Sequence, residues 1–195
     1  MSTESSCPNC GFRFNCICHA QPTLHSRGHF ILLTHDKEFG KATNTGQLMA
    51  RSLSGCQQIR WSRTEPPQAL LDLLADDTLQ PWLLFPADDQ HPAVSFQAAT
   101  DKKPLFILLD ATWQEARKMV RKSPWLACLP RLSLQPEQLS GYALRRNQQP
   151  GHLCTCETGI ALLTLLDEPH QAAALQHYFD AFLHIFHAEQ SGHKR

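Results

Sequence analysis

The chain alternates between short apolar runs and segments with helical spacing. Apolar runs of strand length predict strands over residues 29–35, 56–63, 81–86 and 104–110. Apolar positions three and four residues apart predict helices over residues 44–53, 66–77, 111–122, 157–168 and 170–190. Near-continuous apolar strands that alternate with helices are typical of an α/β fold with a largely parallel sheet covered on both faces. In such sheets, ligands bind at the carboxyl ends of the strands.

The first 22 residues break this pattern, because they are polar and rich in cysteine. They contain the spacing Cys-x2-Cys-x5-Cys-x-Cys, formed by Cys7, Cys10, Cys16 and Cys18. Without a secretory signal, this spacing predicts a metal site rather than disulfides. Structural zinc is the favoured ion because Cys-x2-Cys is half of a common tetrahedral site, while an iron–sulfur cluster and ligation by His19 remain open. We therefore predict a zinc knuckle over 1–22 and a main domain over 23–195.

Length and charge limit the classes of function. A chain of 195 residues is expected to form one main domain with a small appendage. A formal net charge of zero excludes a globally basic protein, so that any contact with nucleic acid must depend on local patches. We find no segment typical of a signal peptide or a membrane span, and expect a soluble cytoplasmic protein without membrane contact. No feature indicates a protein partner.

The strongest strand ends in a carboxylate, Asp110. One interpretation is that Asp110 caps the next helix, where a carboxylate accepts hydrogen bonds from free backbone N–H groups. The other is that it lies at the floor of a ligand cleft, as a proton acceptor or an orienting group. Trp113 likewise has two interpretations, a core residue or the wall of a pocket for a flat ring.

Basic side chains form local groups along this neutral chain. The helix after Trp113 carries two rows of like charge at i,i+4 spacing, Arg117 with Arg121 and Lys118 with Lys122. Because like charges at this spacing disfavour the helix, a phosphate-contacting face explains them better than a solvated one. Smaller basic groups are Lys37 with Lys41 and Arg145 with Arg146.

Five motifs together carry a resemblance to a known family. In chain order they are "CPNCGFRFNCIC", "THDKEFGKATNTG", "LLFPADD", "DATWQEARKM" and "LRRNQQPGHLCTCETGIALL". This series resembles the DTW-domain family over residues 7–185. The resemblance implies a tRNA-uridine aminocarboxypropyltransferase that uses S-adenosylmethionine to place a 3-amino-3-carboxypropyl group on N3 of a uridine, releasing 5′-methylthioadenosine. It also implies a SPOUT-type fold with a C-terminal trefoil knot, which periodicity alone does not predict.

The same resemblance implies roles for individual residues. Asp110 is the catalytic residue, which removes or orients the N3 proton. The implied adenosylmethionine site consists of Leu84, Phe85, Pro86, Thr112, Trp113, Leu153, Thr155 and Glu157. The implied tRNA contacts are Lys41, Asn44, Thr45, Arg117, Arg121, Arg145 and Arg146. The first three of these are also candidates for binding the methionine carboxylate and amine. Cys156 departs from the small hydroxylic or aliphatic residue expected in the "CTCET" loop.

Two other functions remain open at this point. A methyltransferase of the same fold and cofactor would release adenosylhomocysteine instead of methylthioadenosine. A zinc-knuckle RNA-binding protein without catalysis would bind RNA and turn nothing over.

Overall fold

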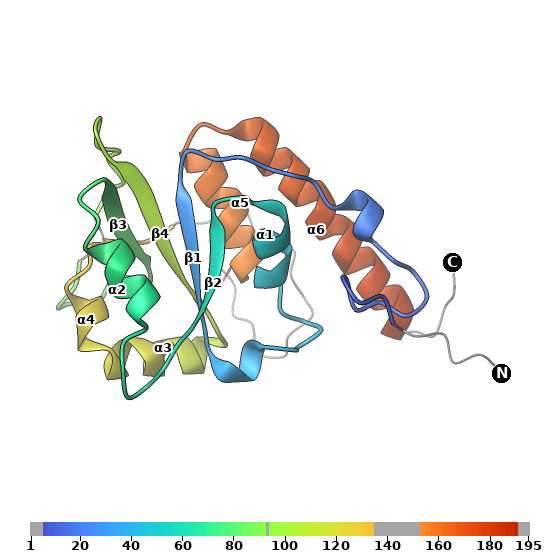
Figure 1. Ribbon diagram of the computed structural model, residues 1–195, viewed down its shortest axis with the longest axis horizontal. Coiled ribbons are helices and arrows are strands. Elements are labelled where there is room, and N and C mark those ends of the chain that lie inside the picture. Colours follow the sequence, from blue (N-terminus) through green and yellow to red (C-terminus); the bar gives the residue numbers. More distant parts are fainter. Residues whose placement is uncertain (1–5, 93, 135–152, 191–195) are drawn as a thin grey trace.

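The core of the molecule is a five-stranded sheet in which every pair of neighbouring strands is parallel (Figure 1). The computed structural model describes residues 6–92, 94–134 and 153–190. The strands lie in the order β2-β1-β4-β3-β5. Their bounds are β1 (His29–Thr34), β2 (Cys56–Arg60), β3 (Leu79–Leu84), β4 (Lys103–Asp110) and β5 (Arg131–Leu132). The central strands β1 and β4 are almost wholly buried, as their continuous apolar character predicts.

Helices cover both faces of the sheet (Figure 1). The first face packs against α1 (Gly46–Ser52), α5 (Thr155–Leu165) and α6 (Pro169–Gln190). The second face packs against α2 (Gln68–Leu74), α3 (Trp113–Lys122) and α4 (Pro124–Ala127). Alternation along β1 divides the core in two, because Phe30 and Leu32 face the first layer while Ile31 and Leu33 face the second. The predicted α/β fold with a parallel sheet is therefore confirmed.

The helix after β4 begins later than the sequence pattern predicts. Thr112 is its N-cap: its hydroxyl accepts the N–H of Glu115, and the Glu115 carboxylate accepts the N–H of Thr112. Asp110 is instead the last residue of β4. The interpretation of Asp110 as a helix cap is therefore wrong, because a Thr two residues later forms the complete capping box.

The N-terminal segment packs against the end of α6, with the 3-10 turn η1 (Cys18–Ala20) beside that helix. The Phe12 ring lies 5.7 Å from the ring of Phe182 and 6.4 Å from that of Phe186, measured between centroids. The carboxylate of Glu189 accepts the backbone N–H groups of Phe14 and Asn15, at 2.7 and 3.3 Å. The predicted Cys-rich segment thus shares the core of the first helix layer.

A knot depends on the path of the whole chain, including residues 135–152, which lie outside the described residues. The trefoil knot therefore stays a prediction. Among the described helices, none has the length and apolar character that a bilayer crossing requires.

Candidate functional site

A buried polar cluster lies where β1 and β4 end side by side. The sheet register pairs Thr34 with Asp110. The Oδ2 atom of Asp110 accepts the Nδ2 amide of Asn44 at 2.9 Å and lies 3.1 Å from the hydroxyl of Thr34. Its Oδ1 atom accepts the hydroxyl of Thr155 at 3.0 Å. Side chains from β1, the segment before α1, and α5 therefore meet at the carboxylate that ends β4, in a residue that is 1% exposed.

The electrostatics of Asp110 reflect this burial. Loss of water around the carboxylate raises its pKa above the ordinary range, because the charged form is disfavoured in a medium of low dielectric. The hydrogen bonds from Asn44, Thr155 and Thr34 favour the charged form and offset part of this effect. The buried carboxylate of Glu38 adds to the rise, and Lys41 forms an ion pair with Glu38 at 2.8 Å.

A second set of contacts joins α1 to α5 next to this cluster. The hydroxyl of Thr45 accepts the N–H of Cys156 at 3.3 Å, and the Asn44 side chain accepts the N–H of Gly46 at 2.7 Å. The first turn of α5 is closed by Glu157, whose carboxylate accepts the N–H of Cys154 at 2.8 Å. Cys156, which differs from the residue type expected in the family, is completely buried between the sheet and the layer of α1, α5 and α6.

A pocket of about 110 Å³ lies beside the cluster, at the carboxyl ends of β3 and β5. Its described lining consists of Leu84, Phe85, Pro86, Trp113, Leu132, Ser133, Leu134, Leu153 and Thr158. The rings of Phe85 and Trp113 have centroids 6.5 Å apart. Leu134 and Leu153 flank residues 135–152, which lie outside the described residues. Small-molecule sites are typically several hundred Å³, apolar, and located at this edge of a parallel sheet.

The structure brings five of the eight predicted cofactor residues to this pocket: Leu84, Phe85, Pro86, Trp113 and Leu153. The other three are placed differently. The hydroxyl of Thr112 donates to Glu115 at 2.8 Å, Thr155 binds Asp110, and Glu157 caps α5. These three residues shape the helices that form the wall, and none of them belongs to the described lining.

Arg131 was missed by sequence reasoning. Its guanidinium is 3% exposed and donates to the carbonyl of Pro86 at 3.2 Å and to the carboxylate of Asp88 at 2.6 Å. It also lies 5.3 Å from the ring of Phe85. Hydrogen bonds from His91 and Arg131 hold the pKa of Asp88 well below its usual range. Arg131 thereby fixes the loop that carries Phe85 and Pro86 into the pocket. In the sequence, Arg131 stands alone among mostly apolar residues (125–134), which indicates burial but does not show which carboxylate it would meet.

The predicted tRNA-contacting residues are dispersed. Arg117 and Arg121 are exposed on α3, and neither forms an ion pair with another of the described residues. Lys41 is at the surface, whereas Asn44 and Thr45 are buried next to Asp110. Arg145 and Arg146 lie outside the described residues.

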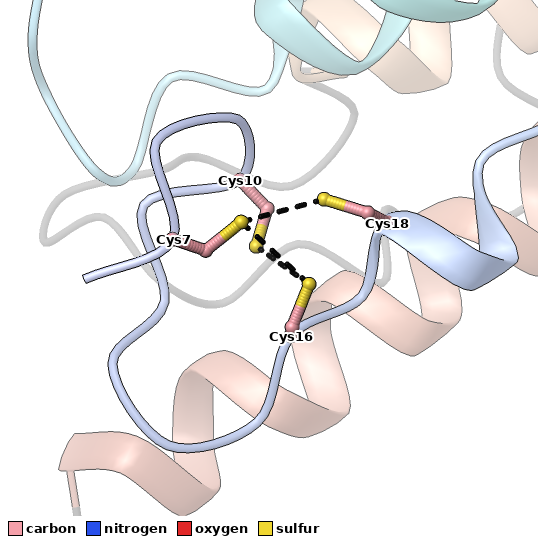
Figure 2. A group of neighbouring side chains, drawn as sticks. All are labelled: Cys7, Cys10, Cys16 and Cys18. Carbon is pink, nitrogen blue, oxygen red and sulfur yellow. Dashed lines mark hydrogen bonds between the residues drawn. The ribbon is translucent and has the colours of Figure 1, made fainter. Parts of the chain in front are cut away.

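The four Cys residues of the N-terminal segment converge, as Figure 2 shows, with their sulfur atoms directed toward one another. The Sγ atoms of Cys7 and Cys18 are 3.6 Å apart, those of Cys7 and Cys16 3.6 Å, and those of Cys10 and Cys16 3.7 Å. All four lie within 4.8 Å of one another. A disulfide requires about 2.05 Å, so these are free thiols grouped around a common centre.

The geometry of this group fits one tetrahedral ion. Four sulfur atoms at 2.3 Å from a central zinc are separated from one another by about 3.8 Å, close to the separations above. An iron–sulfur cluster places several iron and sulfide atoms between its thiolates, and a span within 4.8 Å leaves too little room for them. His19 is not a member of the group. The four-Cys set therefore fits a closed structural zinc site.

Comparison with known proteins identifies the family of the chain. The family model described as "DTW domain" matches residues 4–187. The chain belongs to the DTW domain family. A curated relative from Drosophila melanogaster, named tRNA-uridine aminocarboxypropyltransferase 2, is 31% identical over 157 residues. The match covers 78% of this chain and 62% of that relative's length. No solved structure matches the chain.

In this DTW domain, Asp110, Thr112 and Trp113 of the sequence "DATW" have three different structural roles. Asp110 ends β4 and joins the polar cluster. Thr112 caps α3. Trp113, the first residue of α3, lines the pocket. The motif thus occupies the turn at which the central strand meets the pocket, and each side chain has its own set of contacts.

Proposed function

We propose that this DTW domain is a tRNA-uridine aminocarboxypropyltransferase that moves the 3-amino-3-carboxypropyl group of S-adenosylmethionine to N3 of a tRNA uridine. Membership of the family and the name of the Drosophila relative support the class of reaction. The observation that carries the proposal is the pocket in which Trp113, Phe85 and the start of α5 converge at the carboxyl edge of the sheet.

The pocket residues suit an aromatic ligand with a positive charge. Phe85 and Trp113 line the pocket with aromatic rings, against which a purine would pack, and aromatic faces such as that of Trp113 also attract cations such as a sulfonium. Adenosylmethionine supplies the electrophilic carbon next to its sulfonium. The bond from N3 to that carbon forms, the carbon–sulfur bond breaks, and the neutral thioether 5′-methylthioadenosine leaves. The N3 proton is released to a base.

The exposed face of α3 is our proposed contact with tRNA. Arg117 and Arg121 are one turn apart on a helix whose first residue lines the pocket. Phosphates bound along this face would be adjacent to the site where a uridine enters. Lys41, Arg145 and Arg146 remain further candidates for phosphate contacts.

Structural zinc at Cys7, Cys10, Cys16 and Cys18 is also part of the proposal. A closed four-thiolate site leaves no position for substrate, so the ion would stabilise the N-terminal segment and take no part in transfer. Elemental analysis of the purified protein should give about one zinc per chain. Iron accompanied by visible absorbance would refute the assignment.

Mass spectrometry of nucleosides tests the proposed reaction. The purified protein is incubated with unmodified tRNA and adenosylmethionine, and the digested tRNA is analysed for added mass on uridine. An aminocarboxypropyl increment together with methylthioadenosine supports the proposal. A methyl increment with adenosylhomocysteine would instead assign a methyltransferase, and no increment on any tRNA would refute tRNA transfer.

A matched pair of variants links the reaction to the pocket. Thr158 lines the pocket, and Thr164 lies six residues later on α5 with its side chain exposed. Both hydroxyls donate to the carbonyl four residues earlier, at 3.0 and 3.1 Å. Thr158→Phe should fill the pocket and abolish adenosylmethionine binding in calorimetry, whereas Thr164→Phe should bind normally. Equal binding by the two variants would place the cofactor elsewhere.

A further inference from the structure

The carboxylate of Asp110 is enclosed by side chains and backbone of the protein itself. Each carboxylate oxygen is engaged by protein donors: the amide of Asn44 and the hydroxyl of Thr34 on one side, and the hydroxyl of Thr155 on the other. A Cβ atom added to Gly46 would lie 2.8 Å from Oδ1, so the backbone closes over the carboxylate. A general base must come within hydrogen-bond reach of the proton it accepts, directly or through one water. Asp110 has no surface left for such an approach.

The hydrogen bond to Thr155 connects Asp110 with the pocket. Thr155 is the first residue of α5, and the pocket is lined by Leu153 just before this helix and by Thr158 in its first turn. The position of this wall relative to Trp113 therefore depends on how the start of α5 is held against β4. The hydrogen bond from Thr155 to Asp110 ties this turn directly to the end of β4.

The same cluster also sets the distance between α1 and α5. Asn44 donates to Asp110 and accepts the N–H of Gly46, the first residue of α1. Further along the two helices, a Cβ atom at Gly159 would lie 2.5 Å from the sulfur of Met49, so the helices are in direct contact. A helix held at its first turn by polar contacts and along its length by close packing has one register against the sheet.

We infer that Asp110 is a positioning residue, which fixes the first turn of α5 and with it the Leu153 and Thr158 wall of the pocket, and which does not accept the uridine proton. This inference rests on the proposed function. It distinguishes between the two roles, base or orienting group, that a carboxylate in this motif can have. The N3 proton then leaves to a group outside the buried cluster.

Two substitutions at Asp110 separate these roles. Asp110→Asn removes the basic carboxylate but keeps its shape: the amide oxygen accepts from Asn44 and Thr34, and the amide N–H donates to the Thr155 hydroxyl, which can turn to accept. Asp110→Ala removes every contact. For a positioning residue, the Asn variant should keep kcat within about tenfold of the wild type and show the same pH profile. For a general base, it should lose about 10²- to 10⁴-fold in kcat, together with the limb of the pH profile that reports the base.

The bond partner Thr155 supplies a second test, which remains informative if Asp110→Ala fails to fold. Thr155→Val loses the donor to Asp110 at nearly constant volume, and Thr155→Ser restores it. We expect Thr155→Val to raise the KM for adenosylmethionine by about tenfold or more, the loss expected for a hydrogen bond to a charged group, and Thr155→Ser to rescue it. A KM that is the same in both variants would overturn the inference.

Amide hydrogen exchange gives a readout that does not need catalysis. The N–H of Cys156 donates to Thr45 in the wild-type protein and reports the first turn of α5. Thr155→Val should accelerate exchange in this turn, whereas Asp110→Asn should leave it protected. Unchanged exchange in Thr155→Val would refute the positioning role. A wild-type protein that transfers nothing to tRNA would refute the proposed function alone, since the exchange experiment still tests the role of Asp110.

Discussion

Neutralising two residues of α3 should change how salt affects tRNA binding. Arg117 and Arg121 are exposed, lack an ion-pair partner in the part of the chain that the structure describes, and are four residues apart on one helix. Four residues rise about 6 Å along a helix, so that the two guanidinium groups are able to reach separate phosphates of one strand. The perturbation is the double variant Arg117→Ala, Arg121→Ala.

The size of the effect follows from counterion release. Each phosphate contact contributes about 0.7 to 0.9 to the slope of log K against log salt concentration, so losing two contacts should reduce the slope by about 1.4 to 1.8. The fold-decrease in affinity between 50 and 200 mM salt should therefore be about ten times smaller for the double variant than for the wild type. Its affinity at 50 mM salt should be lower than that of the wild type.

The assay is fluorescence anisotropy with labelled tRNA at several salt concentrations. Lys102→Ala, Lys103→Ala is the matched control, because it removes the same charge from exposed residues at the opposite end of β4. We expect the control to keep the wild-type slope. An unchanged slope in the α3 variant, or an equal decrease in both variants, would refute the reasoning and leave α3 with an ordinary solvated face.

Three further predictions concern the metal site and the polar cluster. Cys10→Ser should lower the zinc content measured by elemental analysis, whereas Cys128→Ser, at an exposed thiol outside the group, should not; equal zinc in both variants would contradict the four-Cys site. Gly46→Ala should destabilise the protein in urea unfolding by about 1 to 3 kcal/mol, because its new Cβ would lie 2.8 Å from Asp110 Oδ1. An unchanged urea midpoint would show instead that the side chains around Asp110 shift to make room for the added methyl group. Burial raises the pKa of Asp110, so the folded protein holds a proton that the unfolded chain releases, and stability should fall as pH rises from the ordinary carboxyl range through the folded pKa. Asp110→Asn should lack this component in urea unfolding at a series of pH values, and identical pH dependence would contradict the raised pKa.

The sequence predicted the centre of the sheet well because β1 and β4 are buried on both faces. The run that ends at Asp110 can satisfy its apolar side chains only in the interior, and β4 indeed lies at the centre of the sheet. The two-residue strand β5 and the four-residue helix α4 were not predicted. Elements this short carry no periodic signal and depend on neighbours that are distant in sequence.

The candidate site was predictable by segment and less so by residue. Pattern and resemblance together selected the strand ends that form the pocket, including Phe85 and Trp113. They could not separate lining residues from supporting ones, because that depends on the direction of each side chain. Thr155 is two residues from the pocket-lining Leu153 and instead binds Asp110. Buried partners such as Arg131 are visible only after folding, since no local pattern shows which carboxylate an Arg will meet.

The contact between Glu189 and Phe14 spans 175 residues, which has a consequence for protein synthesis. On the ribosome, the Cys-rich segment is translated well before the end of α6, which covers Phe12. The nascent chain can assemble its thiolate group before α6 exists, but the aromatic surface beside it stays uncovered until α6 has been translated. Docking of this segment therefore requires the end of α6, and a polypeptide that terminates before this helix would expose that surface to chaperones and proteases.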